Sequence, residues 1–170
     1  MVMVVTGFPG IGGAGEEEVT FPIHAFRIAG NTLLEDERLT MCVEAYVGEN
    51  RQVEDVELAR EALEKLYHQN GYPTVVVNIP EQTVDDGIVR LEVIESRIKR
   101  VRVLGNNYFT MGYISRYLTG IQPGKILYLP QVREELADIN RNPDLKIVPI
   151  LVPGREAGTI DVELKVVDSL

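Results

Sequence analysis

Phe26-Arg-Ile-Ala-Gly30-Asn31 decides the fold, because it returns later in the chain as Val101-Arg-Val-Leu-Gly105-Asn106. The two glycines lie 75 residues apart (105 − 30). In each copy, apolar and polar residues alternate and then meet a Gly-Asn pair, which is typical of a strand that ends in a turn. A second pair of alternating stretches, 89–93 and 160–164, closes each copy. The chain is therefore predicted to hold two copies of one small module.

Both copies have the same predicted order of elements. After the first strand of copy one, apolar residues recur at helical spacing, and a further apolar strand and a closing strand follow. Copy two repeats this order. We therefore predict an α+β fold of two tandem β-α-α-β-β domains, each a three-stranded mixed sheet packed on two helices.

The glycines and charges suggest where the domains begin. Residues 1–20 are rich in glycine and glutamate and are expected to form a flexible leader or linker. The first domain is predicted at 21–96 and the second at 97–168, with almost no linker between them. Within the first domain, Gly48 to Asn50 are expected to end the first helix, and Asp85-Asp86-Gly87 to form the turn before the closing strand.

Net charge and cysteine count bear on a nucleic-acid partner and on an internal disulfide. The chain has 170 residues, with 26 acidic against 17 basic side chains and a formal charge of −9. A field of this sign repels phosphate backbones, so no nucleic-acid partner is expected. A single cysteine, Cys42, excludes a disulfide within the chain.

No candidate catalytic motif has the neighbouring residues that its chemistry requires. The glycines at 10–15 satisfy G-x-G-x-x-G, but Glu16–Glu18 follow where a dinucleotide phosphate needs a helix N-terminus. His24 and His68 have no second metal ligand at helical spacing. Asp85-Asp86 suit a turn better than an acid–base pair. The sequence therefore predicts no enzyme, no cofactor and no metal site.

The apolar strand at 74–79 is the candidate binding element. It carries no charged residue, and the usual strand order for this arrangement places it at a sheet edge, where a partner strand can add. Its flanking prolines and shortness could equally serve only to blunt that edge. Leu63 and Tyr67 are expected either to line a groove beside it or to be core. The predicted peptide-binding residues are Thr74, Val75, Val76, Val77, Asn78, Ile79, Leu63 and Tyr67.

Proline is expected to weaken strand pairing at the edge of either copy. Val76→Pro is expected to abolish capture of a partner strand, because proline removes a donor. In the second copy, Pro149 interrupts the corresponding strand, so pairing is expected to be poorer there.

Several motifs resemble the first polypeptide-transport-associated (POTRA) domain of two-partner secretion transporters. They extend, with matching features of the second copy, across residues 21–168. The motifs are Gly71-Tyr72 through Ile79-Pro-Glu-Gln82, Gly87 to Glu95 and Arg97-Ile98. The second copy supports the resemblance through Gly105-Asn106 and through Asn140 to Asp144, which resembles that family's exit from the second long helix.

The resemblance implies a place and a partner. In that family, tandem POTRA domains stand in the periplasm before an outer-membrane β-barrel, and they capture the secretion signal of a large haemolysin- or adhesin-like protein. The chain is accordingly expected to be a periplasmic fragment whose own C-terminal barrel is missing, attached to the outer membrane in the full-length protein. Its expected partner is the secreted polypeptide, bound by β-augmentation and passed to the barrel.

Two alternatives remain open at this point. One is a scaffold of an outer-membrane protein assembly machine, in which the modules bind accessory proteins or nascent barrel strands. The other is the POTRA region of an appended hydrolase.

Overall fold

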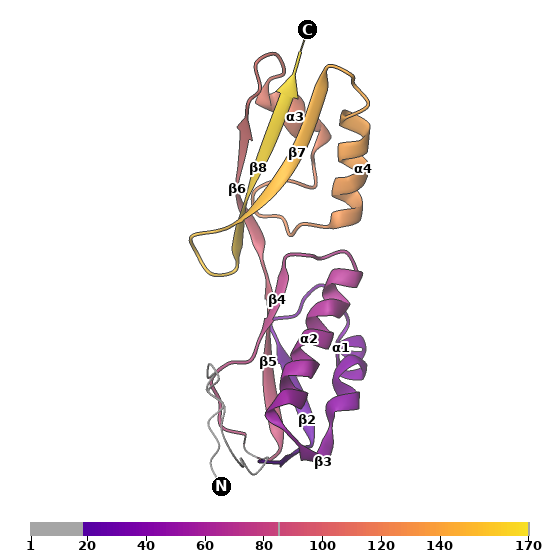
Figure 1. The fold of residues 1–170 in the computed structure, drawn as a ribbon, viewed down its shortest axis with the longest axis vertical. Coiled ribbons are helices and arrows are strands. Elements are labelled where there is room, and N and C mark those ends of the chain that lie inside the picture. Colours follow the sequence, from indigo (N-terminus) through magenta and orange to yellow (C-terminus); the bar gives the residue numbers. More distant parts are fainter. Residues whose placement is uncertain (1–18, 85, 170) are drawn as a thin grey trace, which may run out of the picture. The chain divides into compact units, whose positions relative to one another are not determined.

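The computed structural model describes residues 19–84 and 86–169, and it forms two compact units (Figure 1). Of the described residues, the first unit holds 19–67, 76–84 and 86–94, and the second holds 68–75 and 95–169. Most of the predicted leader, residues 1–18 with the G-x-G-x-x-G motif, lies outside the described residues, and so does Asp85 of the predicted turn.

The first sheet has three strands in the order β2-β5-β4. β2 runs parallel to β5, with Phe26 opposite Val89 and Ile28 opposite Leu91. Figure 1 shows the two helices on one face of this sheet. The elements are β2 (Ala25–Ala29), α1 (Asp36–Val43), α2 (Val53–Gln69), β4 (Val75–Asn78) and β5 (Ile88–Glu95).

The second sheet repeats this topology in the order β6-β8-β7. β8 is its central strand, parallel to β6 and antiparallel to β7. The predicted α+β fold class, with two β-α-α-β-β modules, is confirmed. The elements are β6 (Arg97–Leu104), α3 (Met111–Tyr117), α4 (Leu129–Ile139), β7 (Leu145–Pro153) and β8 (Thr159–Asp168).

The repeated glycines explain why the Gly-Asn motif recurs. Gly30 has φ +87° and Gly105 has φ +86°, a region that side chains disfavour. A Cβ on Gly30 would lie 2.3 Å from the carbonyl oxygen of Val93, and one on Gly105 would lie 2.6 Å from that of Val166. In both sheets, the first strand therefore ends where its backbone passes against the central strand, and glycine alone fits there.

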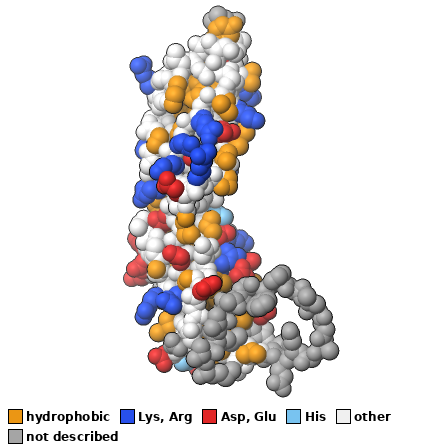
Figure 2. Space-filling model, turned by 90° about the vertical axis from the view of Figure 1, so that its left-hand side faces the viewer, with side chains coloured by type: hydrophobic (Ala, Val, Ile, Leu, Met, Phe, Trp, Pro, Cys, Tyr) orange, Lys and Arg blue, Asp and Glu red, His pale blue; other side chains and the backbone are white. Residues whose placement is uncertain are grey.

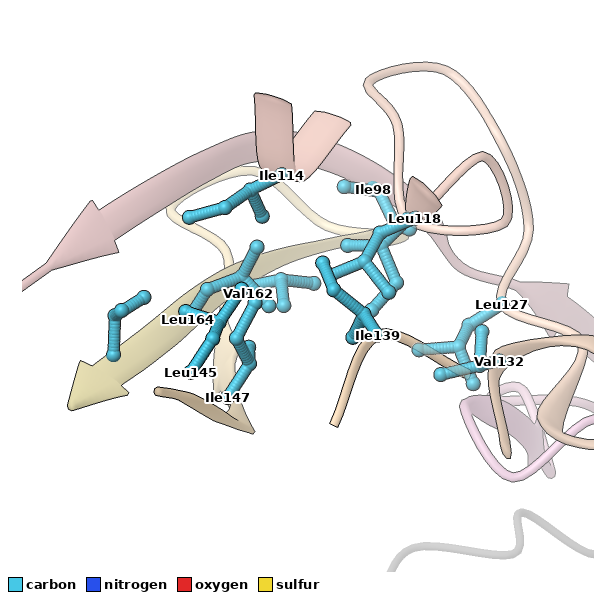
Figure 3. Packing of buried hydrophobic residues seen from close by; sticks show 12 residues of the cluster. Ile98, Ile114, Leu118, Leu127, Val132, Ile139, Leu145, Ile147, Val162 and Leu164 are labelled. Carbon is cyan, nitrogen blue, oxygen red and sulfur yellow. The ribbon is translucent and has the colours of Figure 1, made fainter. Parts of the chain in front are cut away.

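Each module has its own apolar core. In the second unit, Ile114 of α3, Val132 of α4 and Val162 and Leu164 of β8 are all buried in one cluster. Figure 3 shows Val162, Leu164, Leu145 and Ile147 close together, with Val132 beside Leu127 at one end of the cluster. Burying such aliphatic side chains supplies most of the stability of a module of this size.

The first unit contains a small sheet that the sequence did not predict. β1 (Phe21–Ile23) pairs antiparallel with β3 (Gly48–Arg51), and the 3₁₀ helix η1 (Glu44–Tyr46) precedes β3. The prediction that Gly48 to Asn50 only end the first helix is therefore incomplete. β3 is polar and lacks alternation, so its sequence gives no strand signal. Its conformation depends on pairing and on Arg51, whose guanidinium donates to the carbonyls of Ala45 and Val47 at 2.9 and 2.7 Å.

Candidate functional site

β4 is an edge strand of the first sheet. In the order β2-β5-β4, its one strand neighbour among the described residues is β5. The side chains of Val75 and Val77 are buried, whereas Val76 is 44% exposed and Asn78 is also exposed. The edge position that the sequence predicts for this strand is confirmed.

The backbone of Val77 at this edge is occupied by two side chains of α2. Its N–H donates to Glu64 Oε2 at 3.0 Å, and its C=O accepts from Arg60 Nη1 at 3.4 Å. Arg60 Nη1 also donates to the same Glu64 oxygen at 3.2 Å. The Arg60–Glu64 pair thus presents one acceptor and one donor to Val77, as a residue of a neighbouring strand would.

These contacts establish which residues of β4 face outward. Successive backbone groups in a strand point to opposite sides, and Val77 points toward α2 side chains and away from β5. Val75 has the same parity, and its C=O lies 2.9 Å from Nε2 of His68. Val76 and Asn78 therefore direct their backbone groups toward β5. Val76→Pro stays a prediction. On this geometry the N–H that it removes points toward β5, and Val77 carries the N–H that points outward.

The remaining predicted binding residues take different places. Leu63 and Tyr67 of α2 are 0% exposed, so they lie in the core and line no open groove. Thr74 is half-buried, and its Oγ1 is buried without a hydrogen-bond partner among the described residues. Ile79 is half-buried beside the core of the first unit. The predicted strand residues therefore lie together at the sheet edge, whereas Leu63 and Tyr67 lie in the core.

The corresponding edge of the second module, β7, is blocked differently. The side-chain amide of Asn140 accepts from the N–H of Ile147 at 2.7 Å and donates to its C=O at 3.1 Å. Ile147 therefore faces outward, and so do Pro149, Leu151 and Pro153, which share its parity. Proline has no N–H, so two outward positions of β7 offer no donor to a partner strand.

A third arrangement of this kind lies at the end of the Ile79-Pro-Glu-Gln82 motif. The Gln82 amide accepts from the N–H of Arg90 at 2.7 Å and donates to its C=O at 2.9 Å. Gln82 is only 5% exposed. Sequence reasoning missed its role, because the burial that requires Gln82 to be hydrogen-bonded is visible only in the structure.

Basic side chains gather over the second unit in Figure 2, with acidic side chains among them. On the sheet, Arg100 Nε donates to Asp161 Oδ2 at 3.0 Å, and Arg102 lies 4.0 Å from the same oxygen. The hydrogen bond from Arg100 holds the pKa of Asp161 below its ordinary value, against the opposing effect of burial. Lys99 pairs with Glu156 at 3.2 Å. The acids thus balance much of the positive charge on β6.

The histidines do not assemble a metal site. His24 Nδ1 lies 3.0 Å from the carbonyl oxygen of Asp86, and His68 Nε2 bonds Val75. Among residues 19–84 and 86–169, no three His, Cys, Asp or Glu side chains are grouped as metal ligands. Within the same residues, no helix combines the length and apolarity needed to cross a membrane.

Comparison with known proteins identifies the first module. Residues 21–96 match the family of POTRA domains of the ShlB type. The outer membrane transporter CdiB of Dickeya dadantii (strain 3937) is 24% identical over 144 residues, which is 85% of this chain and 25% of that protein. The chain spans about a quarter of the length of the curated relatives it matches.

Solved structures show the same fold across both modules. CdiB from Escherichia coli superposes with a TM-score of 0.81 at 22% identity, over 95% of this chain and 30% of that one. The N-terminal domain of Omp85 from the cyanobacterium Thermosynechococcus elongatus gives a TM-score of 0.69 at 22% identity, over 89% of this chain and 68% of that one. Residues 21–96 therefore match the POTRA family of the ShlB type, and the two modules share the fold of the corresponding part of CdiB from Escherichia coli.

Proposed function

We propose that the chain is the periplasmic polypeptide-binding region of an outer-membrane two-partner secretion transporter. It captures the secretion signal of a haemolysin- or adhesin-like protein and passes it to a β-barrel, without chemistry or cofactor. The curated relatives are transporters, which supports a role in transport. We further propose that the secretion signal is captured by strand addition to β4.

The observation that carries this proposal is the difference between the two sheet edges. At β7, prolines remove two outward donors, so that edge offers little to a partner strand. At β4, Val77 keeps both its N–H and its C=O, and only side chains occupy them. Side chains can move aside at low cost, whereas a missing donor cannot be restored. β4 is therefore the better acceptor of an extended segment.

Binding at this edge is expected to be weak and reversible. Ordering an extended segment costs about 2–5 kcal/mol of the gross interaction energy. A short edge strand recovers that cost with a few main-chain hydrogen bonds. Transient capture of this kind suits handover to a channel.

Val77→Pro tests this mode, because it removes the outward N–H of β4 and leaves the ladder with β5 its donors. The matched control is Leu151→Pro, which removes an outward N–H from β7. Binding of the purified secretion-signal domain to the chain is measured by calorimetry, after circular dichroism has established folding. We expect Val77→Pro to weaken binding by about tenfold or more, equivalent to about 1.4 kcal/mol, and Leu151→Pro to leave it unchanged.

A second measurement keeps the test valid if Val77→Pro does not fold. Amide chemical shifts of the wild-type chain are followed while the unlabelled signal domain is added. Shifts confined to β4 and the side of α2 around Arg60 support the proposal. Shifts confined to β7, or to loops away from both edges, contradict it.

A further inference from the structure

The hydrogen bonds around Val77 form a closed ring. Val77 N–H, Glu64 Oε2, Arg60 Nη1 and Val77 C=O are linked in turn by contacts of 3.0, 3.2 and 3.4 Å. An incoming strand needs the same two backbone groups. Strand addition at β4 therefore requires the Arg60–Glu64 pair to leave Val77.

The pair is placed to open. The side chains of Arg60 and Glu64 are 20% and 26% exposed, and they lie one helical turn apart at the surface of α2. Both side chains still reach solvent, so water can form hydrogen bonds with the guanidinium and the carboxylate when they leave Val77. Gln82, which holds Arg90 in the same manner, is 5% exposed and has no such freedom. The Arg60–Glu64 pair and Gln82 thus bind a backbone in the same geometry, but water can reach the hydrogen bonds of the pair more easily.

The charge around the ring is unbalanced. Besides Glu64, Arg60 contacts Glu57 at 2.6 Å and Glu61 at 3.7 Å. One guanidinium thus serves three carboxylates, and the four side chains carry a formal charge of −2 (1 − 3). When Val77 passes its N–H to another strand, Glu64 loses a donor that Arg60 alone cannot replace.

An added strand places half of its side chains where they reach these carboxylates. Side chains alternate along a strand, and those on the face of Val75 and Val77 point to the helix side of the sheet. A lysine or arginine at such a position offers Glu64 a new charged donor. A glutamate there meets three like charges.

We propose that the Arg60–Glu64 pair is a latch that closes the β4 edge, and that the edge selects extended segments with a lysine or arginine on the α2 side. The basic side chain of the segment replaces the Val77 N–H as the partner of Glu64. The selectivity rests on the proposed function, whereas the latch is a property of the free chain. The two parts have separate tests.

The latch is tested without any ligand by hydrogen exchange of the Val77 amide. In Glu64→Ala this amide loses its acceptor, and we expect its exchange to become about tenfold faster or more. Glu61→Ala is the matched control, because Glu61 contacts Arg60 and has no contact with Val77 in the ring. An unchanged Val77 rate in Glu64→Ala, or an equal acceleration in Glu61→Ala, overturns the latch.

The selectivity is tested with three fluorescein-labelled hexapeptides. They alternate valine and threonine and differ only at one central residue, which is lysine, glutamine or glutamate. Fluorescence polarisation with the full chain is expected to show the lysine peptide binding about tenfold more tightly than the glutamine peptide, and the glutamate peptide binding most weakly. Equal binding of the three, a preference for glutamate, or no binding by any of them at about 1 mM overturns the selectivity.

Two variants connect the preference to Glu64. Glu64→Gln keeps an acceptor for Val77 but removes the charge, so the lysine and glutamine peptides are expected to bind within about twofold of each other. Glu37→Gln, at an exposed position of α1, removes the same charge elsewhere and is expected to keep the tenfold preference. If the signal domain still shifts β4 amides while the peptides show no preference, the selectivity fails and the proposed function stands.

Discussion

Asn140 binds both backbone groups of Ile147 through its side-chain amide, at 2.7 Å for the N–H and 3.1 Å for the C=O. One side chain thus completes the hydrogen bonding of an edge residue that no strand covers among the described residues. Removing it leaves two partly buried backbone groups without this partner. Side chains also bind both backbone groups of Val77 at the edge strand β4 and of Arg90 in the central strand β5, so the two modules use the same means.

Asn140→Leu is expected to lower the free energy of unfolding by about 1–3 kcal/mol, because it leaves a donor and an acceptor unpaired. Asn140→Asp keeps the acceptor and is expected to cost less. Urea denaturation followed by circular dichroism measures both. Arg141→Gln is the control, since that side chain is 80% exposed and its replacement is expected to change stability by less than about 0.5 kcal/mol. Equal stability of Asn140→Leu and the control would show that water satisfies Ile147.

Gln82→Leu is expected to destabilise the first module by about 1–3 kcal/mol, because the N–H and C=O of Arg90 lose their buried partner. Thermal unfolding of the chain measures the effect. Gln69→Leu, at an exposed position of α2, is the comparison and is expected to be nearly neutral. A neutral Gln82→Leu would mean that the Arg90 backbone finds another partner.

Gly30→Ala and Gly105→Ala are expected to cost about 1–3 kcal/mol each, because both force a side chain into a positive-φ residue whose Cβ would meet a carbonyl oxygen. Gly112→Ala in α3 is the control, since the nearest atom to its Cβ lies 4.0 Å away. There alanine is expected to stabilise the helix slightly. Similar stabilities for all three variants would remove the steric account of the repeated motif.

Asp168 gives the second module a pH-dependent contribution to stability. Its carboxylate accepts from the backbone N–H groups of Tyr108 and Phe109 at 2.8 and 2.9 Å. Burial pushes the pKa of Asp168 upward, but the backbone donors at Phe109, Asn107 and Tyr108 outweigh it and hold the pKa below its ordinary value. A lowered native pKa means that the contribution is complete above the unfolded pKa of about 3.9 and is lost as the pH falls through the native value.

The stability difference between the wild-type chain and Asp168→Asn is therefore expected to be largest near pH 6 and to shrink below about pH 4. Urea denaturation at a series of pH values measures it. A difference that stays constant from pH 6 to pH 3 would show that the carboxylate charge adds nothing to the bonds at the Asn107–Phe109 turn.

Much of the fold follows from local patterns in the sequence. The Gly-Asn repeats at 30–31 and 105–106, together with the alternation in β5 and β8, indicate two modules and their closing strands. The β1–β3 pair does not follow, because β3 is polar and its conformation depends on pairing with a distant segment. Local propensity carries no information of that kind.

The candidate site is only half predictable for a related reason. The position of β4 at an edge follows from strand order, but Arg60 and Glu64 look in the sequence like an ordinary i,i+4 surface pair. Their contact with Val77 depends on how α2 lies against the sheet. Likewise Leu63 and Tyr67 share the apolar stripe of α2, and only the packed structure shows both to be fully buried.

The most direct test of strand addition to β4 is an isotope-filtered NOE measurement on the labelled chain bound to the unlabelled secretion-signal domain. The account predicts intermolecular contacts between the backbone of the signal and the amide of Val77, in the regular spacing of a β-ladder. Contacts of that pattern at β7, or a bound complex in which the Val77 N–H still belongs to Glu64, would contradict it.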